Sequence, residues 1–267
     1  MIPTKEMNPH VPETPVEIAS DVIKCSKLGA SIAHIHARGR DGGNTYKKGV
    51  YADIISRIRN KNKDIVIVVS TSGRHYPEYE QRAQVLELEG SVKPDMASLT
   101  LGSVNFNKTV SVSHPDVIMN LADNMMNKGI KPELEIFDLG MVNFAKYLIT
   151  KDLIEPPYYF NIIMGNIASA QAKMHHLGLI VSELPDNSIW SVGGVGNYQK
   201  TINALAVVSG EGGIRVGLED NIWYDEARTT YATNEMLIKR MVKLAEMIER
   251  PLATPDDVRR MLNLNNP

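Results

Sequence analysis

The sequence predicts a single α/β domain built as a (β/α)₈ TIM-type barrel. Apolar, strand-like runs alternate with helical segments along most of the 267 residues, and such alternation is typical of a parallel sheet. The length also matches the ~250 residues of a typical barrel. A doubly wound open sheet is the alternative, but no G-x-G-x-x-G motif follows the first predicted strand to support it. No linker or shift in composition divides the chain, so residues 1–267 are predicted to form one domain with C-terminal helices.

The elements follow one another in regular order. Thr14-Pro15-Val16-Glu17 is a capping box with proline at the first helical position, so a helix begins there and runs to about Gly29. Asp64–Ser70 is a continuous β-branched run, which is typical of a strand covered on both faces. The predicted strands are 31–36, 65–70, 96–101, 132–137, 159–164, 188–192 and 213–219. The later helices are predicted at 51–61, 79–90, 114–128, 140–150, 169–183, 198–209 and 226–248, with a last one opened by the capping box Thr254-Pro255-Asp256-Asp257.

One strand of the expected eight is missing from this prediction. Residues 1–13 are irregular and carry prolines, so they do not supply it. A parallel barrel closes only when each strand has two neighbours, and we therefore expect a gap between strands 31–36 and 213–219. The simplest interpretation of the gap is that the natural chain starts upstream of Met1.

Two histidines mark the end of the first predicted strand. His34 and His36 are two residues apart, so on a strand they point to the same face with Cα atoms about 6.5–7 Å apart. Both imidazoles can then reach one cation, and imidazole is a common ligand of transition metals. Two histidines alone are a weak pattern, and a hydrogen-bonded, catalytically idle pair is the competing interpretation.

Polar residues at other strand ends extend this candidate site, because a TIM barrel carries its active site at the carboxyl ends of its strands. Arg215 and Glu219 share one face of the last predicted strand. Buried charges of this kind are costly unless they are paired or bound to a metal. Two histidines and one carboxylate form a metal site with an open position, as in catalytic zinc sites, although non-haem iron uses the same ligands. From their places at strand ends, Ser98, Thr100 and Glu135 are expected to contact substrate.

The composition gives little reason to expect other classes of partner. A net charge of −2 does not suggest nucleic acid or an anionic membrane. The N-terminus lacks the apolar core of a signal peptide, and no apolar run is long enough to span a bilayer. The single cysteine, Cys25, excludes an intrachain disulfide and fits a reducing compartment. We therefore expect a soluble, cytoplasmic protein.

Five segments, in order along nearly the whole chain, resemble motifs of the β-keto acid cleavage enzymes. They are His34–Arg38 (H-x-H-x-R in that family), Ser70–Gly73 (S-T-G-G), Pro94–Phe106 (P-E-M-A-S/T-L, then G-S/T-x-N-F), Pro132–Met141 (P-E-x-E-x-F/Y, then G-M) and Gly213–Asn221 (G-H-x-R-x-G-x-E-D-N). The resemblance includes the 3-keto-5-aminohexanoate cleavage enzyme of lysine fermentation. Five motifs together are a specific signal.

The resemblance implies a zinc-dependent (β/α)₈ barrel that converts a β-keto acid and acetyl-CoA into acetoacetate and a new acyl-CoA. It also implies a homotetramer. The residues it implies are His34, His36 and Glu219 as metal ligands, and Asp220, Arg215 and Ser70 as a proton-abstraction triad.

Two departures from the family pattern bear on the substrates. The glutamate that holds the substrate's amine in the amino-keto enzyme aligns near Ile2, so the resemblance does not extend to recognition of that amine. The family's G-x-G-R after the seventh strand is Gly194-Val195-Gly196-Asn197 here. Barrels often bind phosphate in this loop, so Gly194 and Gly196 are expected to contact coenzyme A, with binding altered at Asn197.

Two other functions compete with this hypothesis. A metal-dependent hydrolase on a TIM barrel also carries H-x-H at a strand end, but it needs further histidines at later strand ends, and strands 132–137 and 159–164 supply none. A non-catalytic member that binds metal or acyl-CoA is favoured by the missing strand and by Asn197. A steady-state assay separates the second alternative from an enzyme.

Overall fold

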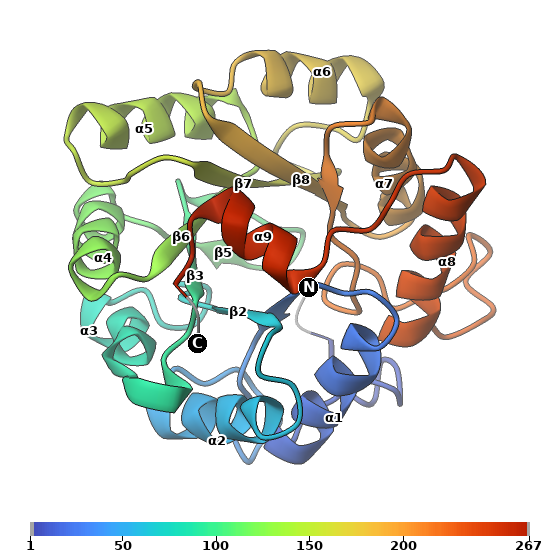
Figure 1. Cartoon of the computed structure of the whole chain (residues 1–267), viewed down its shortest axis with the longest axis horizontal. Helices are drawn as coiled ribbons and strands as arrows, with labels where there is room; N and C mark the ends of the chain where they lie inside the picture. Colours follow the sequence, from blue (N-terminus) through green and yellow to red (C-terminus); the bar gives the residue numbers. More distant parts are fainter. Residues whose placement is uncertain (1–2, 266–267) are drawn as a thin grey trace.

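The computed structural model describes residues 3–265, and within them one parallel sheet curls into an open barrel (Figure 1). Neighbouring strands of the sheet are parallel throughout. In spatial order the strands are β1 (Ile32–Ile35), β2 (Val66–Val69), β3 (Met96–Thr100), β6 (Lys131–Ile136), β7 (Tyr158–Met164), β8 (Ser188–Gly194) and β9 (Gly213–Ile214). The predicted TIM-type architecture is confirmed, and β2 is buried along its whole length as its β-branched sequence predicts.

Helices surround the sheet, and one more lies across its end (Figure 1). Their bounds are α1 (Pro15–Ser26), α2 (Lys48–Arg59), α3 (Tyr79–Arg82), α4 (Pro115–Lys128), α5 (Leu139–Thr150), α6 (Met174–Ser182), α7 (Tyr198–Ser209), α8 (Asn234–Met247) and α9 (Pro255–Leu262). Both predicted capping boxes are present: Thr14 and Glu17 bond reciprocally at the start of α1, and Thr254 and Asp257 do so at α9.

Some predicted helices are wrong in extent. The segment 79–90 is α-helical only as far as Arg82 and continues as short 3₁₀ turns at Ala83–Glu87 and Gly90–Val92. The predicted helix 226–248 begins at Asn234, where the Thr233 hydroxyl accepts a hydrogen bond from the Met236 N–H and caps it. Helix 169–183 is shorter, as α6. A hairpin of β4 (Val104–Asn105) and β5 (Val110–Ser111) was not predicted, because two-residue strands carry no periodicity.

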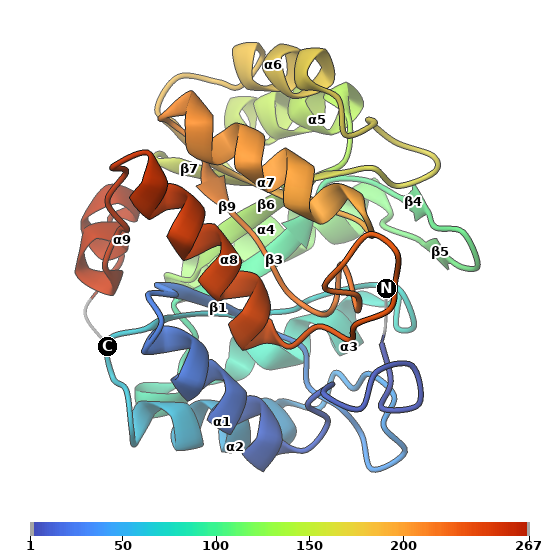
Figure 2. The same ribbon diagram turned by 90° about the vertical axis from the view of Figure 1, so that its right-hand side faces the viewer.

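Two layers of the core pack on the sheet, one outside it and one inside it, and a third cluster joins Val11 to Leu218, Ala232 and Leu237. The larger layer packs the outward residues of the strands, such as Ile67 and Phe160, against the surrounding helices. The smaller layer fills the barrel interior at its amino-terminal end, where Val66 and Val68 of β2 meet Val258 and Leu262 of α9. Figure 2 shows α9 at one end of the barrel and the β4–β5 hairpin at the other. The carboxyl ends of the strands are therefore left open by α9.

The sheet has an open seam between β1 and β9. Among residues 3–265 neither strand has a second neighbour in the sheet, which confirms the predicted gap. Three of the four residues of β1 are only half-buried as a result, in contrast to β2. A cavity of about 480 Å³ extends along the seam and is lined by both strands and by side chains of α1 and α8.

The last strand is also shorter than predicted. Residues 213–219 were expected to be extended, but β9 ends at Ile214, and a turn forms at 218–220. With a neighbour on the β8 side alone, this segment has fewer ladder hydrogen bonds to hold it extended.

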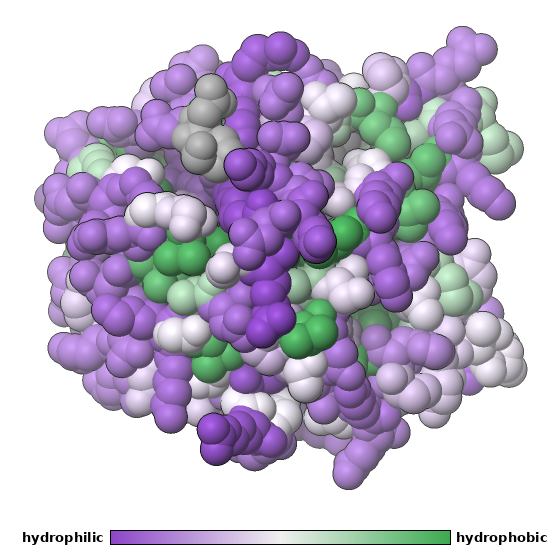
Figure 3. All heavy atoms as spheres, turned by 60° about the horizontal axis from the view of Figure 1, so that its bottom comes forward, coloured by the Kyte–Doolittle hydropathy of each residue, from purple (hydrophilic) through white to green (hydrophobic). Residues whose placement is uncertain are grey.

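The face of the molecule drawn in Figure 3 is mainly polar. In the view of Figure 3 hydrophilic residues cover most of the visible face, and hydrophobic residues form small separate areas. Within the described residues, no helix is both long and apolar enough to cross a bilayer.

A buried ion network at the amino-terminal end of the barrel gives a test of stability. Asp95 accepts hydrogen bonds from Arg59 of α2 at 2.5 Å and from Arg259 of α9 at 2.8 Å, and all three side chains are under 10% exposed. We expect Asp95→Ala to lower the free energy of unfolding by about 3–5 kcal/mol, because it leaves two buried guanidinium groups without their carboxylate. Urea denaturation measures this. The control is Asp53→Ala, which removes an exposed partner of Arg57 and should cost at most about 0.5 kcal/mol; equal losses in the two variants would contradict the assignment.

Candidate active site

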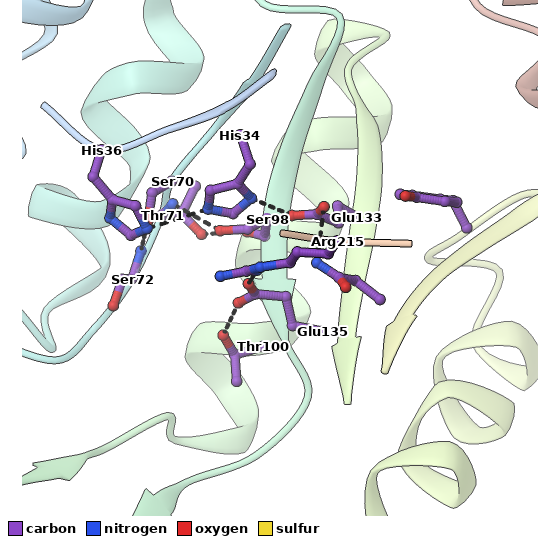
Figure 4. A network of polar contacts seen from close by, with 12 residues as sticks. His34, His36, Ser70, Thr71, Ser72, Ser98, Thr100, Glu133, Glu135 and Arg215 are labelled. Atoms are coloured by element: carbon purple, nitrogen blue, oxygen red, sulfur yellow. Dashed lines mark hydrogen bonds and ion pairs between the residues drawn. The ribbon is translucent and has the colours of Figure 1, made fainter. Parts of the chain in front are cut away.

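Three side chains of types that can ligate a metal converge at the open end of the barrel. His34 in β1 and His36, one residue beyond its end, both point inward, as the two-residue period predicts, and their Nε2 atoms are 3.2 Å apart (Figure 4). Glu219 Oε1 lies 3.1 Å from His36 Nε2. One ligand atom from each of the three residues lies within 4.8 Å of the other two. Two nitrogen ligands of a tetrahedral zinc ion are about 3.3 Å apart, so this donor set fits a divalent cation.

Glu219 reaches this cluster through a turn and not along a strand. The Arg215 N–H donates to the carbonyl of Val192 at 2.8 Å, which keeps that residue against β8. The N–H groups of Asp220 and Asn221 then both donate to the carbonyl of Gly217, and the chain reverses there. Arg215 and Glu219 therefore converge as predicted, with Arg215 Nη2 2.7 Å from Glu219 Oε2. The turn brings them together, and not the two-residue period of a strand.

Arg215 is the centre of a buried ion network. Its guanidinium donates to Asp220 at 3.0 Å. It also donates to Glu135 at 3.2 Å, and the hydroxyl of Thr100 donates to Glu135 at 2.7 Å (Figure 4). Burial alone would lower the pKa of Arg215, but the charges of Asp220, Glu219 and Glu135 raise it well above its usual value. Arg215 thus remains a fixed cation that orients three carboxylates.

Glu133 is a member of the site that the sequence analysis did not single out. It is 2% exposed, and its Oε2 lies 2.6 Å from His34 Nδ1, on the side of the ring away from His36. The side-chain amide of Asn161 donates to its other oxygen at 3.1 Å. Burial lowers the pKa of His34, but Glu133 raises it to about 9. The available signal was the P-E-L-E sequence, because a two-residue spacing turns Glu133 and Glu135 to the same face of β6.

The charge balance of this region also suits a cation. Glu133, Glu135, Glu219 and Asp220 lie around Arg215, so the carboxylates outnumber the arginine at this point of the barrel. The alternative cluster of His34, Glu133 and Glu135 has the same spacing. Its carboxylates are engaged by His34 Nδ1 and by Arg215 and Thr100. Glu219 also accepts from Arg215 through Oε2, but its Oε1 contacts His36, which belongs to the same cluster, so the cluster with His36 and Glu219 is better suited to hold a cation.

Two predicted serines have mainly structural contacts. Ser70 is buried, and its hydroxyl accepts a hydrogen bond from the Ser72 N–H and has no hydrogen bond to Asp220 or Arg215 among the described residues. Ser98 is 1% exposed, and its hydroxyl accepts from the N–H of Thr71 at 3.1 Å. The two serines therefore shape the loop after β2. The carboxylate network joins Arg215 to Glu135 and not to Ser70.

Of the two glycines expected to contact coenzyme A, Gly194 is the last residue of β8 and Gly196 lies in the turn before α7. A Cβ on Gly194 would lie 2.6 Å from Ile202 and 2.7 Å from the backbone of Tyr198, so glycine is needed for α7 to pack here. Gly196 has a positive φ of 61°, and its N–H donates to the carbonyl of Asp220 at 2.8 Å. This loop therefore supports the backbone of the Asp220 turn.

Known proteins resemble this chain over its whole length. The family model of the beta-keto acid cleavage enzyme matches residues 1–264. The chain is 38% identical over 262 residues to the 3-keto-5-aminohexanoate cleavage enzyme of Fusobacterium nucleatum, covering 98% of this chain and 93% of that protein. It is 32% identical over 267 residues to the 3-oxoadipate:acetyl-CoA acetyltransferase of Cupriavidus necator, covering 98% and 91%.

A solved structure has the same fold. The apo structure of ObcA superimposes with a TM-score of 0.86 at 21% identity. The match covers 96% of this chain and 66% of that one, so this chain spans about two-thirds of ObcA. At this level of identity the likeness concerns the fold, and it agrees with the curled parallel sheet described above.

Proposed function

Because this chain belongs to the β-keto acid cleavage enzyme family, we propose that it converts a β-keto acid and acetyl-CoA into acetoacetate and a new acyl-CoA. The names of its relatives support this reaction: one is a 3-oxoadipate:acetyl-CoA acetyltransferase and another, from Rhizobium meliloti and 29% identical, is a 3-dehydrocarnitine:acetyl-CoA trimethylamine transferase. The observation that carries the proposal is that two clusters of side chains lie in direct contact. One cluster is able to hold a cation, and the other is able to accept a proton. Glu219 belongs to the first cluster, its neighbour Asp220 belongs to the second, and Arg215 bonds to both.

His34, His36 and Glu219 are the proposed ligands of one divalent ion, for which we favour zinc because two imidazoles and one carboxylate with an open position are typical of catalytic zinc. Such an ion supplies a Lewis acid for the keto and carboxylate oxygens of a β-keto acid, and so makes the carbon between them more acidic.

Asp220 is the proposed base that removes a proton from that carbon. Its carboxylate is 4% exposed, and Arg215 orients it at 3.0 Å. Glu135 and Thr100 fix Arg215 in turn, so they are proposed to position the base as well as to border the substrate. The deprotonated carbon then attacks the thioester carbonyl of acetyl-CoA, and coenzyme A leaves as its thiolate. The thiolate attacks the carbonyl of the original ketone, and the bond between that carbonyl and the central carbon breaks. The central carbon takes back the proton held by Asp220, which gives acetoacetate and the new acyl-CoA. Ser70 is still proposed as a member of this proton path, but because its hydroxyl has no hydrogen bond to Asp220 or Arg215 among the described residues, the path would reach it through the bound reactants. Gly194 and Gly196 are still proposed to bind coenzyme A.

The contact between Glu133 and His34 is expected to strengthen metal binding. Glu133→Gln removes the charge that accepts from His34 Nδ1 while keeping the size of the side chain. We expect its affinity for zinc to fall about 10- to 100-fold, because carboxylates behind ligating histidines orient the ring and raise its basicity. Competition with a chromogenic chelator measures this, and Glu78→Gln, on the exposed surface, is the control. Unchanged zinc affinity in Glu133→Gln would separate this carboxylate from the metal site.

An assay for acetoacetate tests the proposed reaction. The protein, loaded with zinc, is incubated with acetyl-CoA and a panel of β-keto acids that differ in the group beyond the ketone. At least one of them should give acetoacetate and a new acyl-CoA in equal amounts. A protein that binds zinc and acetyl-CoA but gives neither product with any member of the panel would be a non-catalytic relative. The homotetramer implied by the family resemblance belongs to the same proposal, and light scattering of the purified protein measures it.

A further inference from the structure

Arg74 is a cation at the mouth of the barrel that pairs with no anion in the part of the chain that the structure describes. It follows the loop Ser70–Gly73, which lies beside His36 at the end of β2 (Figure 4). Among residues 3–265 its guanidinium makes no hydrogen bond or ion pair, and its Nε is buried without a partner. Arg38 and Arg82 near this loop differ, since their guanidinium groups donate to neutral oxygens of Pro3 and Gly42, and of Thr71 and Ser113.

The position of Arg74 is fixed by an aromatic platform. Its guanidinium carbon lies 4.3 Å from the centre of the Phe106 ring. Phe106 in turn packs edge-to-face on Phe137, which directly follows β6 and its Glu135. The loop that precedes Arg74 is also near the proposed metal ligands, because Ser70, Thr71 and Ser72 line the same small hollow as His36. A half-buried arginine held in this way is already desolvated in part and loses little side-chain freedom when an anion binds it.

We propose that Arg74 binds an anionic oxygen group carried by a bound reactant, either the second carboxylate of a β-keto dicarboxylic acid or a phosphate of coenzyme A. The inference rests on the proposed function. The carboxylate is the better match, because the loop proposed for coenzyme A follows β8, whereas Arg74 follows β2, four strands away in the order of the sheet. A β-keto acid bound through its first carboxylate and its ketone would then direct its other end to Arg74. The same cation disfavours a substrate with an amine at that end.

The test compares three β-keto acids of similar length: 3-oxoadipate with a second carboxylate, 3-oxohexanoate with a neutral end, and 3-keto-5-aminohexanoate with an amine. In the unchanged protein we expect kcat/KM to fall in that order.

Arg74→Gln keeps a polar side chain and removes the charge. It should lower kcat/KM for 3-oxoadipate about 10- to 100-fold, the range of a hydrogen bond to a charged group, change 3-oxohexanoate less than about 3-fold, and improve the amine substrate. Arg74→Lys should keep part of the preference for 3-oxoadipate. The matched control is Arg40→Gln, an exposed arginine of the loop after β1, which should leave all three values unchanged.

A second acyl donor separates the two sources of the anion. The measurements are repeated with the acetyl thioester of N-acetylcysteamine, which carries no phosphate. If the loss in Arg74→Gln depends on the β-keto acid with both thioesters, the group is the carboxylate; if it appears as a raised KM for acetyl-CoA with every β-keto acid and disappears with the small thioester, the group is a phosphate. Equal losses for all β-keto acids with both thioesters would overturn the proposal and leave Arg74 as a packing residue.

Binding separates this proposal from the proposed function. Calorimetric titration of the zinc-loaded protein with 3-oxoadipate and 3-oxohexanoate, and with acetyl-CoA, needs no turnover. If no acetoacetate forms, the proposed reaction fails, but tighter binding of 3-oxoadipate or of acetyl-CoA that is lost in Arg74→Gln still supports an anion site. Equal binding in the unchanged protein and in Arg74→Gln would contradict it.

Discussion

Replacement of Asp220 by asparagine should lower the rate of acetoacetate formation by about 10²- to 10⁴-fold, the range expected when a general base is removed. Asparagine fits the same space and still accepts from Arg215, but it cannot take a proton from carbon. Because Asp220 lies next to Glu219 without being one of the proposed ligands, the zinc content of the variant should equal that of the unchanged protein. The effect belongs in kcat, since the metal and its ligands remain to bind the β-keto acid.

The control for this prediction is Asp186→Asn, which changes an exposed aspartate far along the chain and should leave the rate unchanged. Near-normal turnover in Asp220→Asn would remove Asp220 from the reaction. Loss of zinc in the same variant would show that the Asp220 carboxylate instead keeps Glu219 in place, through the Arg215 guanidinium that bonds to both.

Replacement of His34 by alanine should abolish both metal binding and turnover. The imidazole is one of three proposed ligands, and the cavity it leaves would also free Glu133 from its partner at 2.6 Å. We expect zinc affinity to fall by more than about 100-fold, which exceeds the loss expected when a residue that only contacts a ligand, such as Glu133, is replaced. Zinc should therefore be absent after dialysis. Elemental analysis measures the metal content, and the melting temperature of each variant shows whether the fold is kept.

His10→Ala is a matched control for this variant, because it removes an exposed imidazole whose ring makes no hydrogen bond among the described residues. It should keep a full complement of zinc. If His34→Ala also keeps its zinc, the metal is bound elsewhere, and the cluster at the open end of the barrel is a hydrogen-bonded pair of histidines.

The architecture could be predicted because the signals are local and repeated. Alternating β-branched strands and capped helices specify the order of the elements, and the missing strand could be counted. The length of the last strand could not be predicted. The segment that holds Arg215 and Glu219 has a strand-like sequence pattern, but in the sheet it has a neighbouring strand on one side only, and the sequence does not show this. The loop before α8 was missed for a related reason: its ends are held by distant Asn8, whose amide donates to the carbonyls of Ile222 and Ala232.

The convergence of the candidate metal ligands could be predicted from the sequence, but the contacts around them could not. His34, His36 and Glu219 converge as expected, because a two-residue spacing and a strand end are readable in the sequence. The pairing of Glu133 with His34 and of Glu135 with Arg215 could not be read, since it depends on which strands face one another across the barrel. Arg74 was missed because a single arginine in a loop belongs to no periodic pattern. Its candidate role depends on a feature of the folded chain, namely that its buried Nε has no hydrogen-bond partner among the described residues.

The most direct measurement of the central claim follows one carbon atom. Acetyl-CoA labelled with carbon-13 at its thioester carbonyl is incubated with the zinc-loaded protein and an unlabelled β-keto acid. The proposed exchange joins the acetyl group to the carbon that Asp220 deprotonates, so the label should appear at the keto carbon of acetoacetate, and the new acyl-CoA should be unlabelled. Unlabelled acetoacetate, or labelled acetate without a new acyl-CoA, would contradict the proposed reaction and indicate hydrolysis.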